Sequence, residues 1–153
     1  MIINPYLNFN GNTEEVFNFY KTVFGGDFPF LMRFNQAPPE SNDQEGCMDQ
    51  GIPEDEANGI MHISLPIGKS MLMGTDVPST MPQVTAGTNI SLCVSVDRRA
   101  EADRIFAALG AGGTVQMPMA DMFWGDYYGM LTDKFQIQWM ISYNEAQDGK
   151  AAQ

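Results

Sequence analysis

The chain has 153 residues, of which 44% are hydrophobic and 18% charged, so it can bury the core of one globular domain. Eight Lys and Arg against nineteen Asp and Glu give a formal net charge of −11, which argues against a nucleic-acid partner and against an anionic membrane surface. Because no apolar run is long enough to span a bilayer and the N-terminus has no signal-peptide pattern, we expect a cytoplasmic protein.

The first half of the chain predicts a strand, a helix and then three more strands. The apolar residues 2–9 end at the turn signal Asn10-Gly11-Asn12, and Asn12 with Glu15 has the spacing of a helix capping box. Apolar residues then recur at helical spacing as far as Gly25, a residue type that commonly ends helices. Strand-like segments follow at residues 28–35, 59–67 and 70–75.

The second half repeats this order further along the chain. Residues 89–96 alternate apolar and polar side chains as a half-buried strand does, Asp97 is the expected N-cap of the next helix, and Gly110 is its expected end. The two helix-ending glycines differ by 110 − 25 = 85, and the same offset places Asn12 on Asp97. Three strand-like segments follow at residues 114–119, 126–132 and 136–142.

The repeat predicts an α+β fold of two βαβββ modules in tandem, which form curved mixed sheets around a cavity. We expect a single domain over residues 1–143, with module one at about 1–76 and module two at about 88–143. Residues 36–58 form a long acidic loop, and residues 144–153 a polar tail. The loop is interpreted as a solvated segment; as a lid over a site it would favour a cationic ligand.

Cysteine and histidine are too few for several classes of site. Cys47 lies in the polar loop and Cys93 in an apolar run, where we expect a buried free thiol and no disulfide. His62 is the only histidine, so a zinc site with several His or Cys ligands from one chain is excluded. The sequence has neither a G-x-S-x-G nucleophile elbow nor a glycine-rich phosphate loop.

The paired modules resemble the vicinal oxygen chelate superfamily, which includes glyoxalase I, extradiol dioxygenases, and fosfomycin- and bleomycin-resistance proteins. Residues 5–12, 61–68, 132–135 and 139–141 carry the likeness, together with Phe123-Trp124-Gly125-Asp126. The set is most similar to the PhnB-like branch, often labelled 3-demethylubiquinone-9 3-methyltransferase-like, although Gln136 stands where that branch usually has Gly. The sequence has no Gly-rich turn that would support a methyltransferase.

The resemblance also implies where a metal would bind. In metal-dependent members, His and Glu at four inward-facing strand positions hold a divalent ion that polarises substrate oxygens. The corresponding windows here contain no His, Asp or Glu, and thioethers and amides are poor ligands for such an ion. We therefore expect no metal of the family type and no other cofactor. The windows are residues 6–8 (or Pro5), 71–73, 89–91 and 138–140.

Six residues are candidates for ligand binding. His62 is either an acid or base in a pocket or a hydrogen-bonded structural residue. The aromatic cluster at residues 123–128 either stacks on a planar ligand or seals the sheet against its own helix or a partner subunit. Asp126 is either a cation contact or a turn cap, and Asp76 is interpreted as a turn residue. The candidates are Phe34, His62, Met73, Trp124, Asp126 and Tyr128.

Three functions remain open. The first is a small-molecule-binding protein without the family's usual metal ligands, comparable to the bleomycin-resistance proteins. The second is a glyoxalase-like lyase or isomerase that is metal-dependent or uses His62. The third is a non-catalytic interaction protein whose cavity is filled by its own side chains. Because family members commonly dimerise, the resemblance also implies a homodimer.

Overall fold

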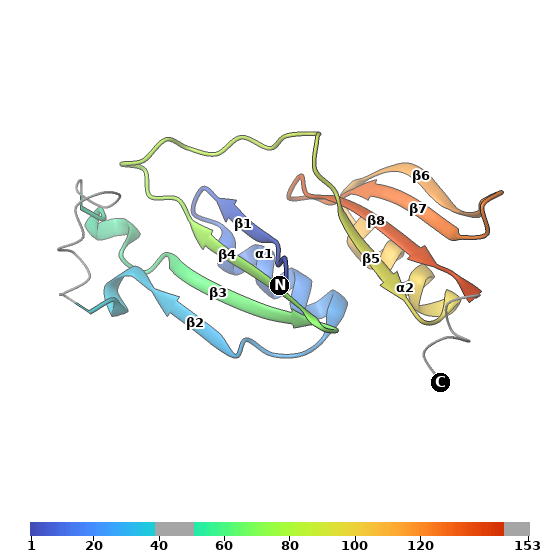
Figure 1. Ribbon diagram of the computed structural model, residues 1–153. Coiled ribbons are helices and arrows are strands. Elements are labelled where there is room, and N and C mark those ends of the chain that lie inside the picture. Colours follow the sequence, from blue (N-terminus) through green and yellow to red (C-terminus); the bar gives the residue numbers. More distant parts are fainter. Residues whose placement is uncertain (39–50, 146–153) are drawn as a thin grey trace. The chain divides into compact units, whose positions relative to one another are not determined.

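Each half of the chain forms one helix and one four-stranded sheet (Figure 1), and the predicted α+β fold of two tandem βαβββ modules is confirmed. The computed structural model describes residues 1–38 and 51–145. The chain divides into two units, Met1–Thr85 and Ala86–Gln153. Neither helix of the described residues is long and apolar enough to cross a membrane.

The first unit contains sheet A, with strand order β1-β4-β3-β2. β1 is parallel to β4, and the other neighbours are antiparallel. β1 begins at Tyr6 and not at residue 2 because Pro5 has no N–H to donate to the ladder. The elements are β1 (Tyr6–Phe9), α1 (Thr13–Phe24), β2 (Phe30–Arg33), β3 (Ile60–Ile67) and β4 (Ser70–Asp76), with 3-10 turns η1 (Phe34–Gln36) and η3 (Glu54–Glu56).

The second unit contains sheet B, with the equivalent order β5-β8-β7-β6. β5 begins at Leu92 and not at residue 89, because its parallel partner β8 begins only at Gln138 and Leu92 already pairs with Trp139. The elements are β5 (Leu92–Val96), α2 (Arg99–Gly110), β6 (Thr114–Asp121), β7 (Tyr127–Thr132) and β8 (Gln138–Tyr143).

One helix covers one face of each sheet. On α1, Phe17 and Tyr20 are fully buried, and a Cβ on Gly74 of β4 would lie only 2.5 Å from the Phe17 ring. Only glycine therefore lets the helix approach β4 this closely. On α2, Ile105 and Leu109 are buried in the same way. Successive residues of a strand point to opposite faces, so every second side chain of each sheet lies on the face away from the helix, which we call the helix-free face.

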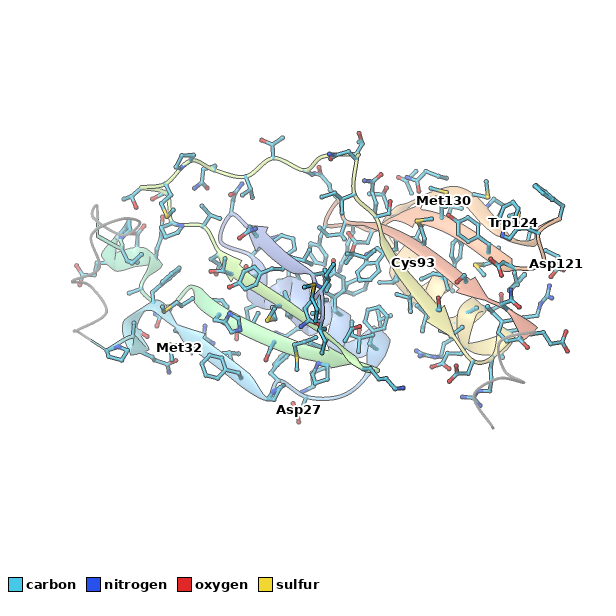
Figure 2. All side chains as sticks on the ribbon, viewed as in Figure 1. Asp27, Met32, Cys93, Asp121, Trp124 and Met130 are labelled. Carbon is cyan, nitrogen blue, oxygen red and sulfur yellow. The ribbon has the colours of Figure 1, made fainter. Side chains whose placement is uncertain are left out.

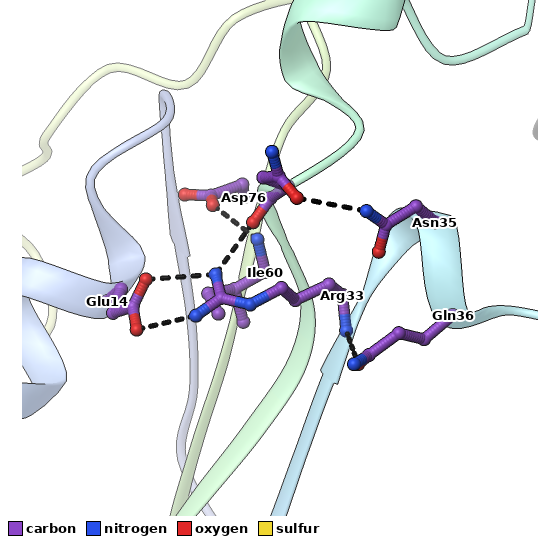
Figure 3. A network of polar contacts seen from close by, with 7 residues as sticks. Glu14, Arg33, Asn35, Gln36, Ile60 and Asp76 are labelled. Carbon is purple, nitrogen blue, oxygen red and sulfur yellow. Dashed lines mark hydrogen bonds and ion pairs between the residues drawn. The ribbon is translucent and has the colours of Figure 1, made fainter.

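The start of α1 is capped from a distant strand, so the predicted capping box is wrong. Asn12 makes no side-chain capping bond, because its φ of −122° and ψ of 19° depart from the extended conformation that capping requires. The buried Asp76, the last residue of β4, supplies the acceptor instead. Its Oδ1 accepts the N–H of Thr13 at 2.9 Å. Its Oδ2 accepts the N–H of Ile60 at 2.7 Å (Figure 3).

Two further local predictions need correction. α2 begins one residue later than expected, with Arg98 and not Asp97 at the N-cap position. Cys93 is a free but exposed thiol, because its strand neighbours Leu92 and Val94 take the side of β5 that faces α2. The apolar run around Cys93 thus reflects only one face of the strand. The other cysteine, Cys47, lies outside the described residues.

Replacing Asp76 with Ala should destabilise the protein by about 2–4 kcal/mol, because two buried N–H groups lose their acceptor. The free energy of unfolding in urea measures the effect. Asp55→Ala removes the same charge from an exposed carboxylate of η3 and serves as the matched control. A loss below about 1 kcal/mol for Asp76→Ala would contradict the capping role.

Candidate functional site

Strand pairing places a row of side chains across the helix-free face of sheet A. Tyr6 on β1 lies opposite Met73 on β4. Met73 lies opposite Ser64 on β3, which in turn lies opposite Phe30 on β2. Residues paired in this way have Cβ atoms about 4.5–5.5 Å apart, so the two rings and the thioether form one continuous surface.

His62 lies on the same face, one step further along β3, opposite Met32. The Tyr6 hydroxyl lies 3.0 Å from Nδ1 of His62, and the two rings are tilted with centroids 5.5 Å apart. The Phe30 ring also contacts the imidazole, in an edge-to-face arrangement with centroids 5.5 Å apart. We call Tyr6, Phe30, Met32, His62 and Met73 the His62 cluster.

The direction of the Tyr6–His62 hydrogen bond determines which nitrogen of His62 carries the hydrogen. Partial burial raises the pKa of Tyr6 above 10, and a hydrogen bond with the Thr75 side chain offsets only part of this rise. The phenol therefore keeps its proton at neutral pH and is able to donate it to Nδ1. In neutral imidazole one nitrogen accepts and the other carries the hydrogen, so with Tyr6 as the donor Nε2–H is the group that His62 offers to a ligand.

The predicted residues Trp124, Asp126 and Tyr128 form a second group, in the second unit, where Figure 2 labels Trp124. Trp124 donates its Nε1–H to Oδ2 of Asp126 at 2.9 Å, and Asn144 donates to the other carboxylate oxygen. The Tyr128 ring contacts Trp124 edge to face at 6.1 Å. Both oxygens of Asp126 thus serve the local structure, which favours its interpretation as a structural residue over a cation contact.

Phe34 belongs to neither group and lines a pocket of about 280 Å³ beside the start of α1. Glu14 and Asp76 also line this pocket, but both carboxylates are already engaged. Glu14 accepts two hydrogen bonds from Arg33, at 2.7 and 2.9 Å (Figure 3), and this contact lowers the pKa of Glu14. Asp76 holds two backbone N–H groups. These contacts fix β2, β3 and α1 to one another.

The structure therefore brings the predicted candidates into three groups. His62 and Met73 belong to one cluster, the Trp124 group to the second unit, and Phe34 to neither. Sequence reasoning missed Tyr6 and Phe30 as ligand-binding candidates. Their alternation with apolar neighbours was visible in the sequence, but their contact with His62 depends on strand order, which the sequence pattern does not specify.

The donor set does not fit a divalent metal held by His and Glu. Across residues 1–38 and 51–145, no group of three or more His, Cys, Asp or Glu side chains could hold a metal ion. In the structure, the helix-free positions within β1 are Tyr6 and Asn8, which offer a phenol and an amide.

Comparison with known proteins places the chain among a set of similar sequences and folds. The family model described as Glyoxalase/Bleomycin resistance protein/Dioxygenase superfamily matches residues 2–141. Protein YjdN of Escherichia coli K12 is 28% identical over 93% of this chain and 95% of its own length.

Solved structures show the same fold. Protein PA1353 from Pseudomonas aeruginosa is 35% identical and superposes with a TM-score of 0.78, covering 94% of this chain and 98% of its own. The PhnB protein from Bacillus cereus is 23% identical with a TM-score of 0.70, covering 94% and 99%. The predicted resemblance to PhnB-like proteins is thus confirmed at the level of fold.

Tyr6→Phe should release the preference of neutral His62 for the Nε2–H tautomer, because the donor to Nδ1 is lost. Since the chain has one histidine, ¹⁵N NMR of the imidazole reports this position without ambiguity. Tyr127→Phe removes a phenol that donates to Asp103 in the second unit and is the control. An unchanged ratio of the two tautomers in Tyr6→Phe would contradict the assigned direction of the bond.

Proposed function

Because this chain belongs to the Glyoxalase/Bleomycin resistance protein/Dioxygenase superfamily, we propose that it binds a small molecule and does so without the family's usual metal ligands. The His62 cluster is the proposed binding site. The proposal rests on the Tyr6–His62 hydrogen bond. Because Nδ1 of the only histidine contacts Tyr6, Nε2 is the ring nitrogen that can contact a ligand, beside the rings of Tyr6 and Phe30.

The chemistry of the cluster indicates the class of ligand. Tyr6 is 42% exposed and Phe30 is 45% exposed, so both rings can contact a flat molecule. The Nε2–H of His62 suits a carbonyl or hydroxyl oxygen as acceptor. Met32 and Met73 add flexible apolar contacts that adjust to shape. The net charge of −11 favours neutral or cationic molecules over anions.

A screen of aromatic carbonyl and phenol compounds, read by the His62 imidazole resonances, tests this proposal. We expect at least one neutral or cationic compound to shift these resonances with saturable binding. Phe30→Ala should weaken that binding by about tenfold, since loss of one stacked ring costs about 1–1.5 kcal/mol.

Phe123→Ala is the matched control, because Phe123 is a 98% exposed phenylalanine in the second unit. Equal affinity of the wild type and of Phe30→Ala would reject the His62 cluster as the site. If Phe123→Ala abolished binding and Phe30→Ala preserved it, the site would instead lie at the Trp124 group.

The same hydrogen bond supports a second candidate, a lyase or isomerase that uses His62. Nε2–H would polarise a substrate carbonyl or enolate oxygen, while Nδ1 continues to accept the Tyr6 proton. Full transfer of the Nε2 proton would require Tyr6 to give its own proton to Nδ1. The raised pKa of Tyr6 opposes that step, which is why we rank binding first.

Turnover of an α-ketoaldehyde hemithioacetal distinguishes the two functions. If the protein is an enzyme of this kind, His62→Gln should lower kcat by about 10²- to 10⁴-fold, as loss of an acid–base residue typically does. Absence of turnover in the wild type, or equal turnover in His62→Gln, would leave binding as the function. The homodimer, the cytoplasmic location and the domain boundary at residue 143 stay predictions.

A further inference from the structure

The pocket beside the start of α1 shares no residue with the His62 cluster. Its volume of about 280 Å³ lies just below the usual range for drug-sized ligands, so it suits a smaller molecule. Three segments line it: the turn before α1 with the first residues of that helix, the loop that contains η3, and the chain that follows β4. Phe34 supplies the aromatic ring among the described residues that line it.

Hydrogen bonds within the protein fix one wall of this pocket. The side chain of Asn10 donates to the carbonyl of Val84 at 2.9 Å and accepts the N–H of the same residue at 3.0 Å. Nε2 of Gln83 donates to the carbonyl of Pro78, also at 2.9 Å. These bonds hold the chain after β4 against the turn before α1, so a ligand does not have to order this wall when it binds.

Phe34 also has a defined place in the pocket, beside Gly59. A Cβ on Gly59 would lie 3.2 Å from the Phe34 ring and 3.3 Å from Oδ2 of Asp76, which is tighter than ordinary van der Waals contact. The N–H of Phe34 donates to the carbonyl of Gly59 at 3.1 Å, so the backbone pairs the two residues as well. Only glycine at position 59 therefore lets the ring lie this close.

The charge inside the pocket is negative. Among the described residues that line it, four are acidic and none is Lys, Arg or His. Two of the four are already compensated: Glu14 accepts two hydrogen bonds from Arg33 (Figure 3). Asp76 accepts two backbone N–H groups. The other two, Asp55 and Glu56 of η3, have no basic residue beside them in the lining.

Glu56 keeps its charge at neutral pH. Its Oε2 accepts the N–H of Ser79 at 2.9 Å. Hydrogen bonds from the side chain and the backbone of Ser79 lower the pKa of Glu56. Because a carboxylate has several acceptor positions on its two oxygens, Glu56 can accept a further donor while it holds Ser79. The neighbouring Asp55 is exposed and adds a second carboxylate on the same turn.

The lining favours an organic cation over a metal ion. Across residues 1–38 and 51–145, no group of three or more His, Cys, Asp or Glu side chains could hold a metal ion. A primary ammonium ion does not need such a group, because each of its three N–H bonds donates to a single oxygen and its charge is attracted to an aromatic face. An alkyl chain attached to it can contact Phe34, Val77 and Pro78, which line the same pocket.

We propose that this pocket binds a primary alkylammonium ion, with its nitrogen at the Glu56 carboxylate and its alkyl chain beside Phe34 and Pro78. The sequence associates the acidic loop at residues 36–58 with a cationic ligand, and η3 is a part of that loop that lines the pocket. The site does not depend on the small-molecule proposal for the His62 cluster, because the two share no residue.

Titration of the full-length protein with n-butylammonium, n-butanol and n-butyrate tests the site, because the three probes are similar in size and differ in charge. The backbone amide signals of Gly59 and Ser79, followed by NMR, report the pocket. We expect saturable shifts in the millimolar range for n-butylammonium, about tenfold weaker binding of n-butanol, and no binding of n-butyrate. The imidazole resonances of His62 should stay unchanged, which separates this site from the His62 cluster.

Variants at Glu56 identify the contact with the nitrogen. Glu56→Gln removes the charge but keeps an oxygen for the N–H of Ser79, so the variant should fold, which circular dichroism verifies. It should weaken n-butylammonium binding by about tenfold, because a hydrogen bond between charged groups is stronger than one to a neutral amide. Glu54→Gln makes the same change at an exposed residue of η3 that does not line the pocket and is the matched control.

Phe34→Leu tests the aromatic contact. It should weaken n-butylammonium binding about two- to fivefold, because a cation–π contact is lost while most of the apolar volume remains. Phe123→Leu changes an exposed phenylalanine of the second unit and should leave the affinity unchanged.

Three results would overturn the proposal. The first is binding of n-butanol as tight as that of n-butylammonium, which would show that the positive charge has no part in it. The second is a shift of the His62 resonances without a shift of Gly59 and Ser79, which would place the ammonium ion at the His62 cluster. The third is equal affinity of Glu56→Gln and Glu54→Gln, which would reduce the effect to the overall charge of the chain.

Discussion

The burial of one helix against one face of a four-stranded sheet determines where every functional group of this protein lies. Where Phe17 of α1 fits against Gly74 of β4, the fully buried strand residues Ile63 and Leu72 face the helix. Strand alternation then sends the remaining side chains to the other face, whatever their chemistry. His62 and Cys93 share this face of their respective sheets for that reason alone. Core packing therefore selects the positions that are available for binding, and the residue types at those positions select the ligand.

The two modules use the same positions for different chemistry. Leu7 and Leu92 occupy equivalent places, and the strand register extends this equivalence across both sheets. Position by position, Asn8 corresponds to Cys93, Thr75 to Met140 and His62 to Met130. Module one thus has nitrogen and oxygen groups where module two has sulfur. The repeat explains the common framework, and the residue types at equivalent positions differ between the two sheets.

Local sequence signals predicted the helices and strands but could not predict contacts between residues far apart in the sequence. Period-two alternation and the glycine stop at Gly25 depend on neighbours in sequence, so strands and helix ends were found within a few residues. The capping of Thr13 by Asp76 joins residues 63 positions apart, and no spacing rule reaches that far. The Tyr6–His62 contact needs the strand order β1-β4-β3 to be known. Cys93 was assigned to the core because an apolar run does not reveal which face a strand buries.

The two hydrogen bonds of Asp76 also constrain the order in which the first unit can fold. The carboxylate that completes the first turn of α1 arrives only when β4 has taken its place beside β1 and β3. An early, isolated α1 would begin with unsatisfied N–H groups and fray there. The helix start and the last strand of the module therefore form late and together, as one cooperative unit. The amide of Thr13, although it lies in a helix, should exchange its hydrogen only when the whole unit opens.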